Sequence, residues 1–461
     1  MTVISTTSGR VRGEIVDGLH RFLGVPYAAA PEGALRFAAP QPSTWDGERD
    51  ATEPGHIAPQ VNRTVGTLDL AALVSADRPQ GGDFLTVDVH SPDPSAGGLP
   101  VMVFIHGGAF VGGTGSAVLY DGSAFARRGV VLVTINYRLG FDGFLSLDGG
   151  ATNIGLRDQI AALTWVRDNV AAFGGDPGNV TVFGESAGAV SVACLLGSPL
   201  ARGLFRRAIV ESGHPEMVRD PGRARQIAEH LAGKLGVPAT AEAFRGFTTS
   251  RLLAAQVEIS SPGNMPDLRD EHGVDPLYGL TPFTPVLGDD VLPAQPRESF
   301  DAGVDLLAGF NAEEMKLYFA PTGVLGAVTE EQAVATLAAS RPDAADVLRG
   351  YGLGEEEPAG EVLSKALTDL VFADGVRRLL ADHPGHSFGY RFDWRSPAFD
   401  GQLGACHGLE LPFVFDTLPA ATALVGPDAP RELADEMQQN WVRFAETGDP
   451  GWAAGAVRSF G

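Results

Sequence analysis

The sequence predicts an α/β fold in which a large, mostly parallel central sheet carries helices on both faces and a small antiparallel sheet lies near the N-terminus. Three observations support this prediction. Apolar strand-like runs alternate with helical patterns, 461 residues suffice for one large sheet with insertions, and 44% of the residues are hydrophobic. Uniformly apolar strands separated by helices are typical of parallel sheets that are buried on both faces.

The predicted elements of the central sheet follow one another from residue 101 onward. Short apolar runs predict strands at 101–108, 129–137, 180–184, 207–213, 305–311 and 387–394. A helix is predicted over 154–173, because apolar residues recur there at steps of three and four, at Ile160, Leu163, Val166, Val170 and Phe173. A second helix follows the strand at 180–184, in the sequence AGAVSVACLL.

Two regions are less regular. Residues 1–100 contain short alternating segments and many prolines, which predicts the small antiparallel sheet. Residues 215–300 contain helical patterns and loops without a clear strand. We expect one domain over 1–461, with 215–300 as a cap-like insertion over a functional site or as an insertion without a functional role.

Charge and composition exclude several classes of function. The chain has 34 basic and 57 acidic residues, a net charge of −23, which disfavours binding to nucleic acid or to an anionic membrane. No apolar run reaches the roughly 18 residues of a transmembrane helix. The N-terminus has neither a basic region nor an apolar run, so no secretory signal is expected. The whole chain has two cysteines, Cys194 and Cys406, which predict a reducing, cytoplasmic location rather than a disulfide framework.

No cofactor is predicted. The sequence contains no cluster with metal-ligand spacing and no G-x-x-x-x-G-K pattern that would hold a phosphate. Composition does not decide whether the chain is a monomer or a dimer.

One serine stands in a pattern that is typical of a nucleophile. Gly184-Glu185-Ser186-Ala187-Gly188 joins an apolar strand to a helix. Glycine is needed at both flanks of such a sharp turn, because side chains there would collide with neighbouring backbone. A tight turn without chemistry predicts the same backbone, so the decision depends on whether partners for Ser186 exist elsewhere.

Three further segments could supply those partners. His106-Gly107-Gly108-Ala109 follows a strand, and its small residues can direct backbone N–H groups at an oxyanion. His407 is the one histidine of ten in a late, strand-following loop approached by small residues. Glu313 and Glu314 follow the strand that ends near Gly309. Each segment is also compatible with a structural role, but the order serine, acid, histidine is that of an α/β-hydrolase.

Longer motifs resemble the type-B carboxylesterase family, the cholinesterase-like branch of the α/β-hydrolases. The resemblance runs along nearly the whole chain, through FLGVPYAAAPEGALRFAAPQP, VMVFIHGGAF, INYRLGFDGFL, NIGLRDQIAALTWVRDNVAAFGGDPGNVTVFGESAG, AIVESG, GFNAEE, CHGLELPFVF and WVRFAETGDP. The segment that ends in FGESAG is the most specific of them.

The resemblance assigns roles to individual residues. It implies a catalytic triad of Ser186, Glu314 and His407. It places the oxyanion hole at Gly108, Ala109 and Ala187, with Gly107 as a flexible neighbour. Two supporting residues, Glu185 and Ser212, would lie beside the triad. It implies hydrolysis of small to medium carboxylic esters through an acyl-enzyme, with an ester as the small-molecule partner and without a metal or cofactor. Glu313 would then face solvent.

The sequence departs from the family pattern at three points. Phe84 stands where many secreted members have cysteine, in agreement with a reduced compartment, and the chain ends soon after TGDP. Ala109 replaces a glycine of many relatives, which is expected to narrow the range of alcohols accepted.

Three alternatives stay open. An amidase or carbamate hydrolase would use the same triad, and a non-catalytic binding protein could share the fold. A thiol mechanism through Cys406 lacks a nucleophile turn of its own.

Overall fold

The computed structural model describes residues 1–461 except 63, 69, 71–77 and 262. The strands are β1 (Thr2–Ser5), β2 (Arg10–Val16), β3 (Leu19–Pro26), β4 (Glu48–Asp50), β5 (Thr86–Ser91), β6 (Leu99–Ile105), β7 (Val131–Ile135), β8 (Gly175–Glu185), β9 (Arg207–Glu211), β10 (Asp305–Asn311), β11 (Ser387–Phe392) and β12 (Val457–Phe460). The helices are α2 (Ser123–Arg127), α3 (Gly140–Phe144), α4 (Ile154–Asn169), α5 (Ala187–Gly197), α6 (Pro221–Leu235), α7 (Ala241–Arg245), α8 (Thr249–Ser260), α9 (Lys316–Phe319), α10 (Val324–Ala327), α11 (Glu330–Ala338), α12 (Ala344–Gly350), α13 (Ala359–Thr368), α14 (Asp374–Asp382), α15 (Leu411–Val414), α16 (Thr422–Val425) and α17 (Arg431–Thr447).

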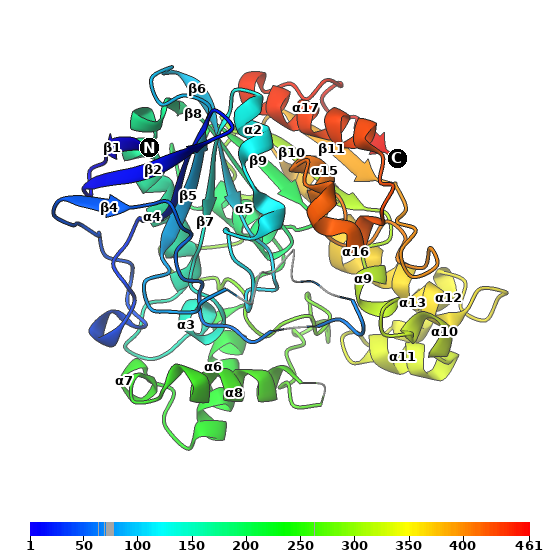
Figure 1. Ribbon diagram of the computed structural model, residues 1–461. Helices are drawn as coiled ribbons and strands as arrows, with labels where there is room; N and C mark the ends of the chain where they lie inside the picture. Colours follow the sequence, from blue (N-terminus) through cyan, green and yellow to red (C-terminus); the bar gives the residue numbers. More distant parts are fainter. Residues whose placement is uncertain (63, 69, 71–77, 262) are drawn as a thin grey trace.

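The strands form one sheet in the order β1-β2-β3-β5-β7-β6-β8-β9-β10-β11-β12, with β4 beside β2 (Figure 1). Every neighbouring pair from β7 to β12 is parallel. The pairs from β1 to β7 are antiparallel, which agrees with the predicted N-terminal sheet. Only β4 differs, because it pairs in parallel with β2.

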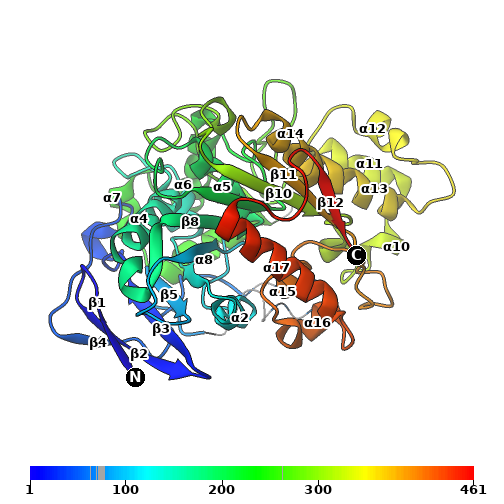
Figure 2. The ribbon, with the colours of Figure 1, turned by 90° about the horizontal axis from the view of Figure 1, so that it is seen from above.

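Helices cover both faces of the sheet. Alternate residues of β6 enter two separate apolar clusters: Val101, Val103 and Ile105 face one cluster, and Met102 and Phe104 face the other. Helices α4 and α5 contact β8 on one face, whereas α17 contacts β6 and β8 on the other (Figure 2). This burial on both faces explains the uniformly apolar strands of the sequence.

Most predicted elements keep their place and change at their ends, and two of these changes are informative. The predicted helix at 154–173 ends as an α-helix at Asn169 and continues as a 3₁₀ turn over Val170–Phe173. Strand β8 begins at Gly175, five residues before the predicted start. Its first five residues, GDPGN, are glycine, proline or polar, so they carry no apolar signal.

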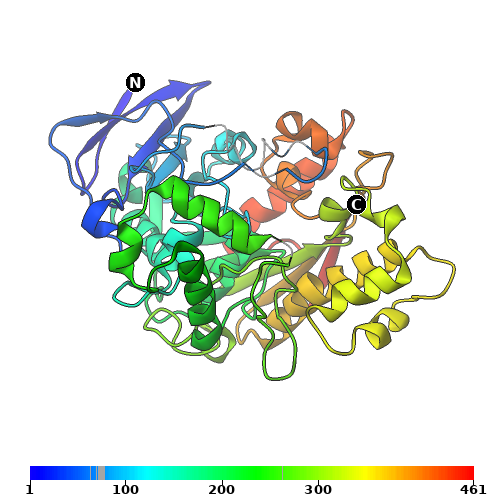
Figure 3. The same ribbon diagram turned by 90° about the horizontal axis from the view of Figure 1, so that it is seen from below.

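Helices form two groups outside the sheet layers. Helices α6, α7 and α8 lie within 215–300, as the sequence predicts (Figure 3). Helices α9 to α14 form a second group between β10 and β11 that the sequence interpretation missed. These helices have four to ten residues each, too few turns to give a long periodic pattern. No helix among the described residues has the length and apolar character that crossing a bilayer requires.

Candidate active site

Ser186 occupies a strained turn between β8 and α5. Its φ of 55° and ψ of −121° are unfavourable for a residue with a side chain, and such strain is concentrated at functional sites. A Cβ atom at Gly188 would lie 1.9 Å from the Ile105 carbonyl oxygen, and one at Gly184 would lie 2.7 Å from it. The Ser186 N–H donates to the Glu211 carbonyl at 2.9 Å. The flanking glycines are therefore required by close packing against β6.

Glu314 and His407 meet although 93 residues separate them in the chain. Glu314 follows β10, and His407 lies in the loop between β11 and α15. The His407 Nδ1–H donates to Glu314 Oε2 at 2.7 Å. The other carboxylate oxygen, Oε1, accepts from Ser212 Oγ at 2.6 Å and from the Asn311 N–H at 2.7 Å. Because Glu314 is fully buried and has three donors, its orientation toward His407 is fixed.

Asn311, at the end of β10, joins the loops that carry the predicted acid and base. Its backbone N–H binds Glu314, and its side-chain Nδ2 donates to the Cys406 carbonyl at 2.7 Å. The same Nδ2 also donates to the Glu410 carboxylate. Sequence analysis missed this residue, because a lone asparagine in GFNAEE gives no signal of what it binds 95 residues later.

The second nitrogen of His407 faces another carboxylate. Nε2 lies 3.0 Å from Glu185 Oε1, and neither atom has an aligned hydrogen-bond partner among the described residues. Burial opposes a charge on His407, but Glu185, Glu314 and Glu410 outweigh it and raise the His407 pKa to about 9. Burial raises the pKa of Glu185 to about 7, although His407 opposes that shift. The pocket thus favours a positively charged imidazole.

Two further carboxyl groups lie buried beneath the pair. Glu211 accepts a hydrogen bond from the Trp441 indole N–H, and Glu410 accepts from Asn311. Burial, followed by repulsion from Glu185 and Glu314, raises the pKa of Glu410 to about 8. Burial and the neighbouring Glu410 raise the pKa of Glu211 well above its usual range. Burial therefore disfavours a negative charge on both of these groups.

The glycine loop after β6 packs against the Ser186 turn. A Cβ at Gly107 would lie 2.5 Å from Glu185 Oε2 and 3.1 Å from the Ser186 Cβ. The N–H groups of Gly108, Ala109 and Ala187 make no hydrogen bond within the described chain. Ala109 has a φ of 55°, an unfavourable conformation for alanine. These amides are free to bind an oxygen anion beside Ser186.

His106 supports this loop as a neutral group. Burial lowers its pKa to about 4, and its ring stacks on Tyr137 with centroids 4.5 Å apart. The Tyr137 hydroxyl donates to the His106 carbonyl at 2.8 Å. His106 therefore contributes packing rather than charge.

The expectation that Glu313 faces solvent is wrong. Its carboxylate accepts from the Ala405 N–H at 3.0 Å and pairs with Lys316 at 2.9 Å and Arg395 at 2.5 Å. Its side chain is 20% exposed. The sequence does not show that Lys316, Arg395 and the Ala405 N–H all contact Glu313. Through these contacts Glu313 anchors the loop that precedes His407.

Both cysteines are fully buried, and burial raises the pKa of each thiol. No cluster of three or more His, Cys, Asp or Glu side chains in the described part of the chain is arranged to hold a metal ion.

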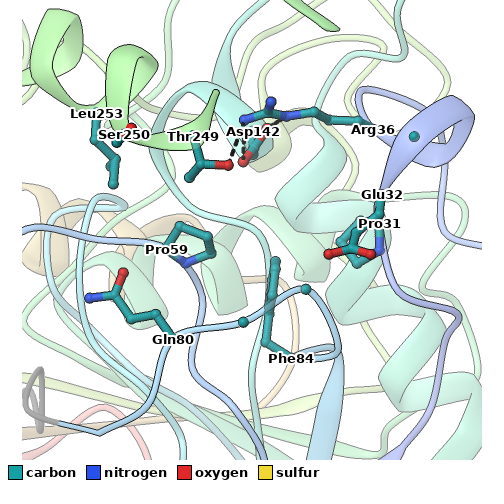
Figure 4. Close-up of a pocket in the computed structure, with 13 residues that line it drawn as sticks. Pro31, Glu32, Arg36, Pro59, Gln80, Phe84, Asp142, Thr249, Ser250 and Leu253 are labelled. Carbon is teal, nitrogen blue, oxygen red and sulfur yellow. Dashed lines mark hydrogen bonds and ion pairs between the residues drawn. The ribbon is translucent and has the colours of Figure 1, made fainter. Parts of the chain in front are cut away.

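A cavity of about 510 Å³ lies beside α8 and contains none of the predicted site residues (Figure 4). Arg36 and Asp142 pair at 2.8 Å in its wall, and the same guanidinium donates to the Phe247 carbonyl at 3.1 Å. Phe84 also lines it. Because no predicted site residue lines it and its Arg36 and Asp142 side chains already bind each other, we assign this cavity no part in the chemistry.

The arrangement of the chain defines a class of protein. Ser186, Glu314 and His407 follow β8, β10 and β11 of one largely parallel sheet, in the chain order of α/β-hydrolases. Comparison with known proteins narrows this class. The model of the carboxylesterase family matches residues 1–457, so the chain belongs to that family and is a carboxylic ester hydrolase.

Relatives resemble the chain over nearly its whole length. Para-nitrobenzyl esterase of Bacillus subtilis (strain 168) is 37% identical, over 97% of this chain and 90% of that protein. Phenmedipham hydrolase of Pseudarthrobacter oxydans is 34% identical with the same coverage. A solved structure of a Geobacillus stearothermophilus carboxylesterase matches with a TM-score of 0.83 at 34% identity and covers 100% of this chain and 96% of that chain.

Proposed function

We propose that the chain hydrolyses small to medium carboxylic esters with Ser186 as nucleophile, His407 as base and Glu314 as the acid that orients it. The observation that carries this proposal is the hydrogen-bonded chain from Ser212 through Glu314 to His407 Nδ1, beside the strained turn at Ser186. We assign the remaining parts to His407 Nε2, which makes no aligned hydrogen bond although it lies 3.0 Å from Glu185 Oε1, and to the amides after β6 and at the start of α5.

The proposed reaction proceeds through an acyl-enzyme. His407 Nε2 takes the proton of Ser186 Oγ as Oγ attacks the ester carbonyl carbon. The amides of Gly108, Ala109 and Ala187 bind the resulting oxyanion. The imidazolium then gives its proton to the departing alcohol oxygen, and water repeats the cycle on the acyl-enzyme. Glu314 fixes the tautomer of His407 and stabilises its positive form.

The walls of the site favour uncharged substrates. Carboxylates lie beneath and beside His407, and the rings of Phe372 and Tyr318 lie 4.7 and 6.0 Å from its ring. A negatively charged acyl group would be repelled by Glu185, whereas a neutral one can pack on the rings. Together with the name of para-nitrobenzyl esterase, this supports neutral esters of aromatic alcohols as the substrate class.

A matched panel of p-nitrophenyl esters and p-nitroanilides of increasing acyl length tests the proposal. The wild-type chain should hydrolyse the esters, and Ser186→Ala should lose on the order of 10³-fold or more in kcat. Hydrolysis of the anilides at comparable rates would show an amidase instead. Substrate binding without turnover would show a binding protein, and activity retained in Ser186→Ala would exclude Ser186 as the nucleophile.

A further inference from the structure

We propose that Phe372 is a positioning residue for the His407 imidazole and that His214 fixes the helical turn that carries Phe372. The inference rests on the proposed function, because it takes His407 as the base. It adds two residues that belong to neither the triad nor the oxyanion hole.

Phe372 lies in an unusual helical turn. Residues Asp369–Ala373 form a π-helical turn between α13 and α14, closed by a bond from the Asp374 N–H to the Asp369 carbonyl. Such turns are rare and occur frequently at functional sites. One extra residue rotates the following side chains by about 100° relative to a continuous α-helix. The turn therefore changes which side chains of this helix face the site.

The Phe372 ring packs on the face of the base. The two ring centroids are 4.7 Å apart with an interplanar angle of 36°, and both side chains are buried. This contact leaves the edges of the imidazole uncovered, so Nδ1 binds Glu314 and Nε2 lies 3.0 Å from the carboxylate of Glu185, the residue before Ser186. A flat apolar neighbour can thus limit rotation of the imidazole without competing for its hydrogen bonds.

The same helix also contacts the loop after β10 that carries Glu314. Thr368 directly precedes the π turn, and its Oγ1 accepts a hydrogen bond from the Met315 N–H at 3.2 Å. Met315 directly follows Glu314. One continuous helical segment therefore contacts the acid loop through Thr368 and the base through Phe372.

His214 connects the π turn to the end of β9. Its Nε2–H donates to the Val371 carbonyl at 3.0 Å, and the side chain is buried. Burial lowers its pKa to about 4, so it is a neutral donor at working pH. The charged groups near it are Glu216, Arg378 and Asp374.

Gly375 explains how His214 reaches the helix. A Cβ at Gly375 would lie 2.1 Å from the His214 ring. Glycine lowers helix stability relative to alanine, and here it permits this close approach. His214 stands two residues after Ser212, the residue that binds Glu314. The support of the acid and the support of Phe372 therefore come from one short segment of chain.

Disturbing Phe372 should affect the base in a specific way. The carboxylates that face His407 are Glu185, Glu314 and Glu410, and all three stay in place. Phe372→Ala would let water reach the imidazole, which relieves the burial that opposes its charge. We expect kcat to fall about tenfold because the base is less well placed. The acidic limb of the kcat/KM profile should move to higher pH by roughly half a unit.

The chain contains a matched control pair away from the site. His383 is buried and its Nε2–H donates to the Val304 carbonyl at 2.8 Å. The Phe300 ring lies 5.9 Å from the His383 ring. Phe300→Ala and His383→Leu therefore remove a similar aromatic–histidine pair without touching His407.

The experiment measures kcat and KM from pH 5 to 10 on one p-nitrophenyl ester, with the p-nitrophenol burst as the count of competent sites. The variants are Phe372→Ala, Phe372→Leu, His214→Leu, His214→Gln, the two controls and Ser186→Ala. We expect Phe372→Ala and His214→Leu to lower kcat per competent site and to shift the acidic limb. His214→Gln, whose amide can reach the Val371 carbonyl, should recover much of the loss.

The double variant His214→Leu/Phe372→Ala provides a further check. If both residues act through one turn, the losses of kcat in the two single variants should not add in the double variant. Unmoved pH profiles and control-like kcat in the Phe372 and His214 variants would overturn the inference, provided Ser186→Ala is inactive. An active Ser186→Ala would instead overturn the proposed function. If His214→Leu does not fold, Phe372→Leu and His214→Gln decide by the same criteria.

Discussion

Replacing Glu314 with glutamine should cripple the enzyme while leaving its shape nearly unchanged. In the structure Glu314 Oε1 accepts from Ser212 Oγ and the Asn311 N–H, and Oε2 accepts from His407 Nδ1. An amide has one acceptor oxygen and one donor nitrogen. The oxygen will take the position facing Ser212 and Asn311, because an NH₂ group there would oppose the Asn311 N–H.

The consequence falls on the tautomer of His407. The NH₂ group then faces Nδ1, so Nδ1 must accept and the ring proton must move to Nε2, which can no longer accept from Ser186. Reversing the amide would leave the buried Asn311 N–H unpaired at a cost of about 1–3 kcal/mol, in addition to the lost Ser212 bond. The matching asparagine replacement in a serine protease triad lowers kcat about 10⁴-fold. We therefore expect a loss of about 10³–10⁴-fold, or about 4–5 kcal/mol in the barrier.

Glu313→Gln is the matched control. Its oxygen can still accept from the Ala405 N–H, and the buried Lys316 keeps a second carboxylate partner, Glu361, at 3.3 Å. The pair with the exposed Arg395 contributes little, about 0–1 kcal/mol. We expect kcat within a few-fold of wild type. Both variants are assayed on the same p-nitrophenyl ester, after their thermal unfolding has been shown to match wild type.

The assignment of the acid fails if Glu314→Gln keeps activity within tenfold of wild type. It also fails if Glu313→Gln shows the large loss with its fold intact.

Three further predictions follow from the same contacts. Because carboxylates raise the His407 pKa to about 9, the acidic limb of kcat/KM should lie above pH 6.5, and Glu185→Gln should move it down by about one unit or more; an unmoved limb would contradict this. Gly188→Ala should lower the free energy of unfolding in urea by about 2–3 kcal/mol, whereas Gly233→Ala, with open space around it in α6, should not; equal stability of the two would refute the packing argument. Maleimides should leave the native chain unmodified, and Cys406→Ala should keep activity within a few-fold; complete loss with the fold intact would restore the thiol hypothesis.

The sequence was most informative where neighbouring residues decide the geometry. Apolar runs predicted the parallel strands. The glycines at 184 and 188 predicted the sharp turn at Ser186, and both glycines pack closely against the end of β6. It was less informative about the helices between β10 and β11, whose few turns carry little periodicity. The resemblance to a family chose Glu314 over Glu313, which local pattern alone did not.

By itself, then, the sequence determined the α/β architecture, the sharp turn at Ser186 and the candidate partners of Ser186, because these depend on steric limits and periodicity over a few residues. Only the tertiary structure decided that Glu313 anchors a loop through Lys316 and Arg395 rather than facing solvent. The tertiary structure alone also showed the hydrogen bond from Asn311 to the Cys406 carbonyl and the contact of Phe372 with His407. These contacts join segments far apart in the chain, and burial there sets charge and orientation, so no local pattern can encode them.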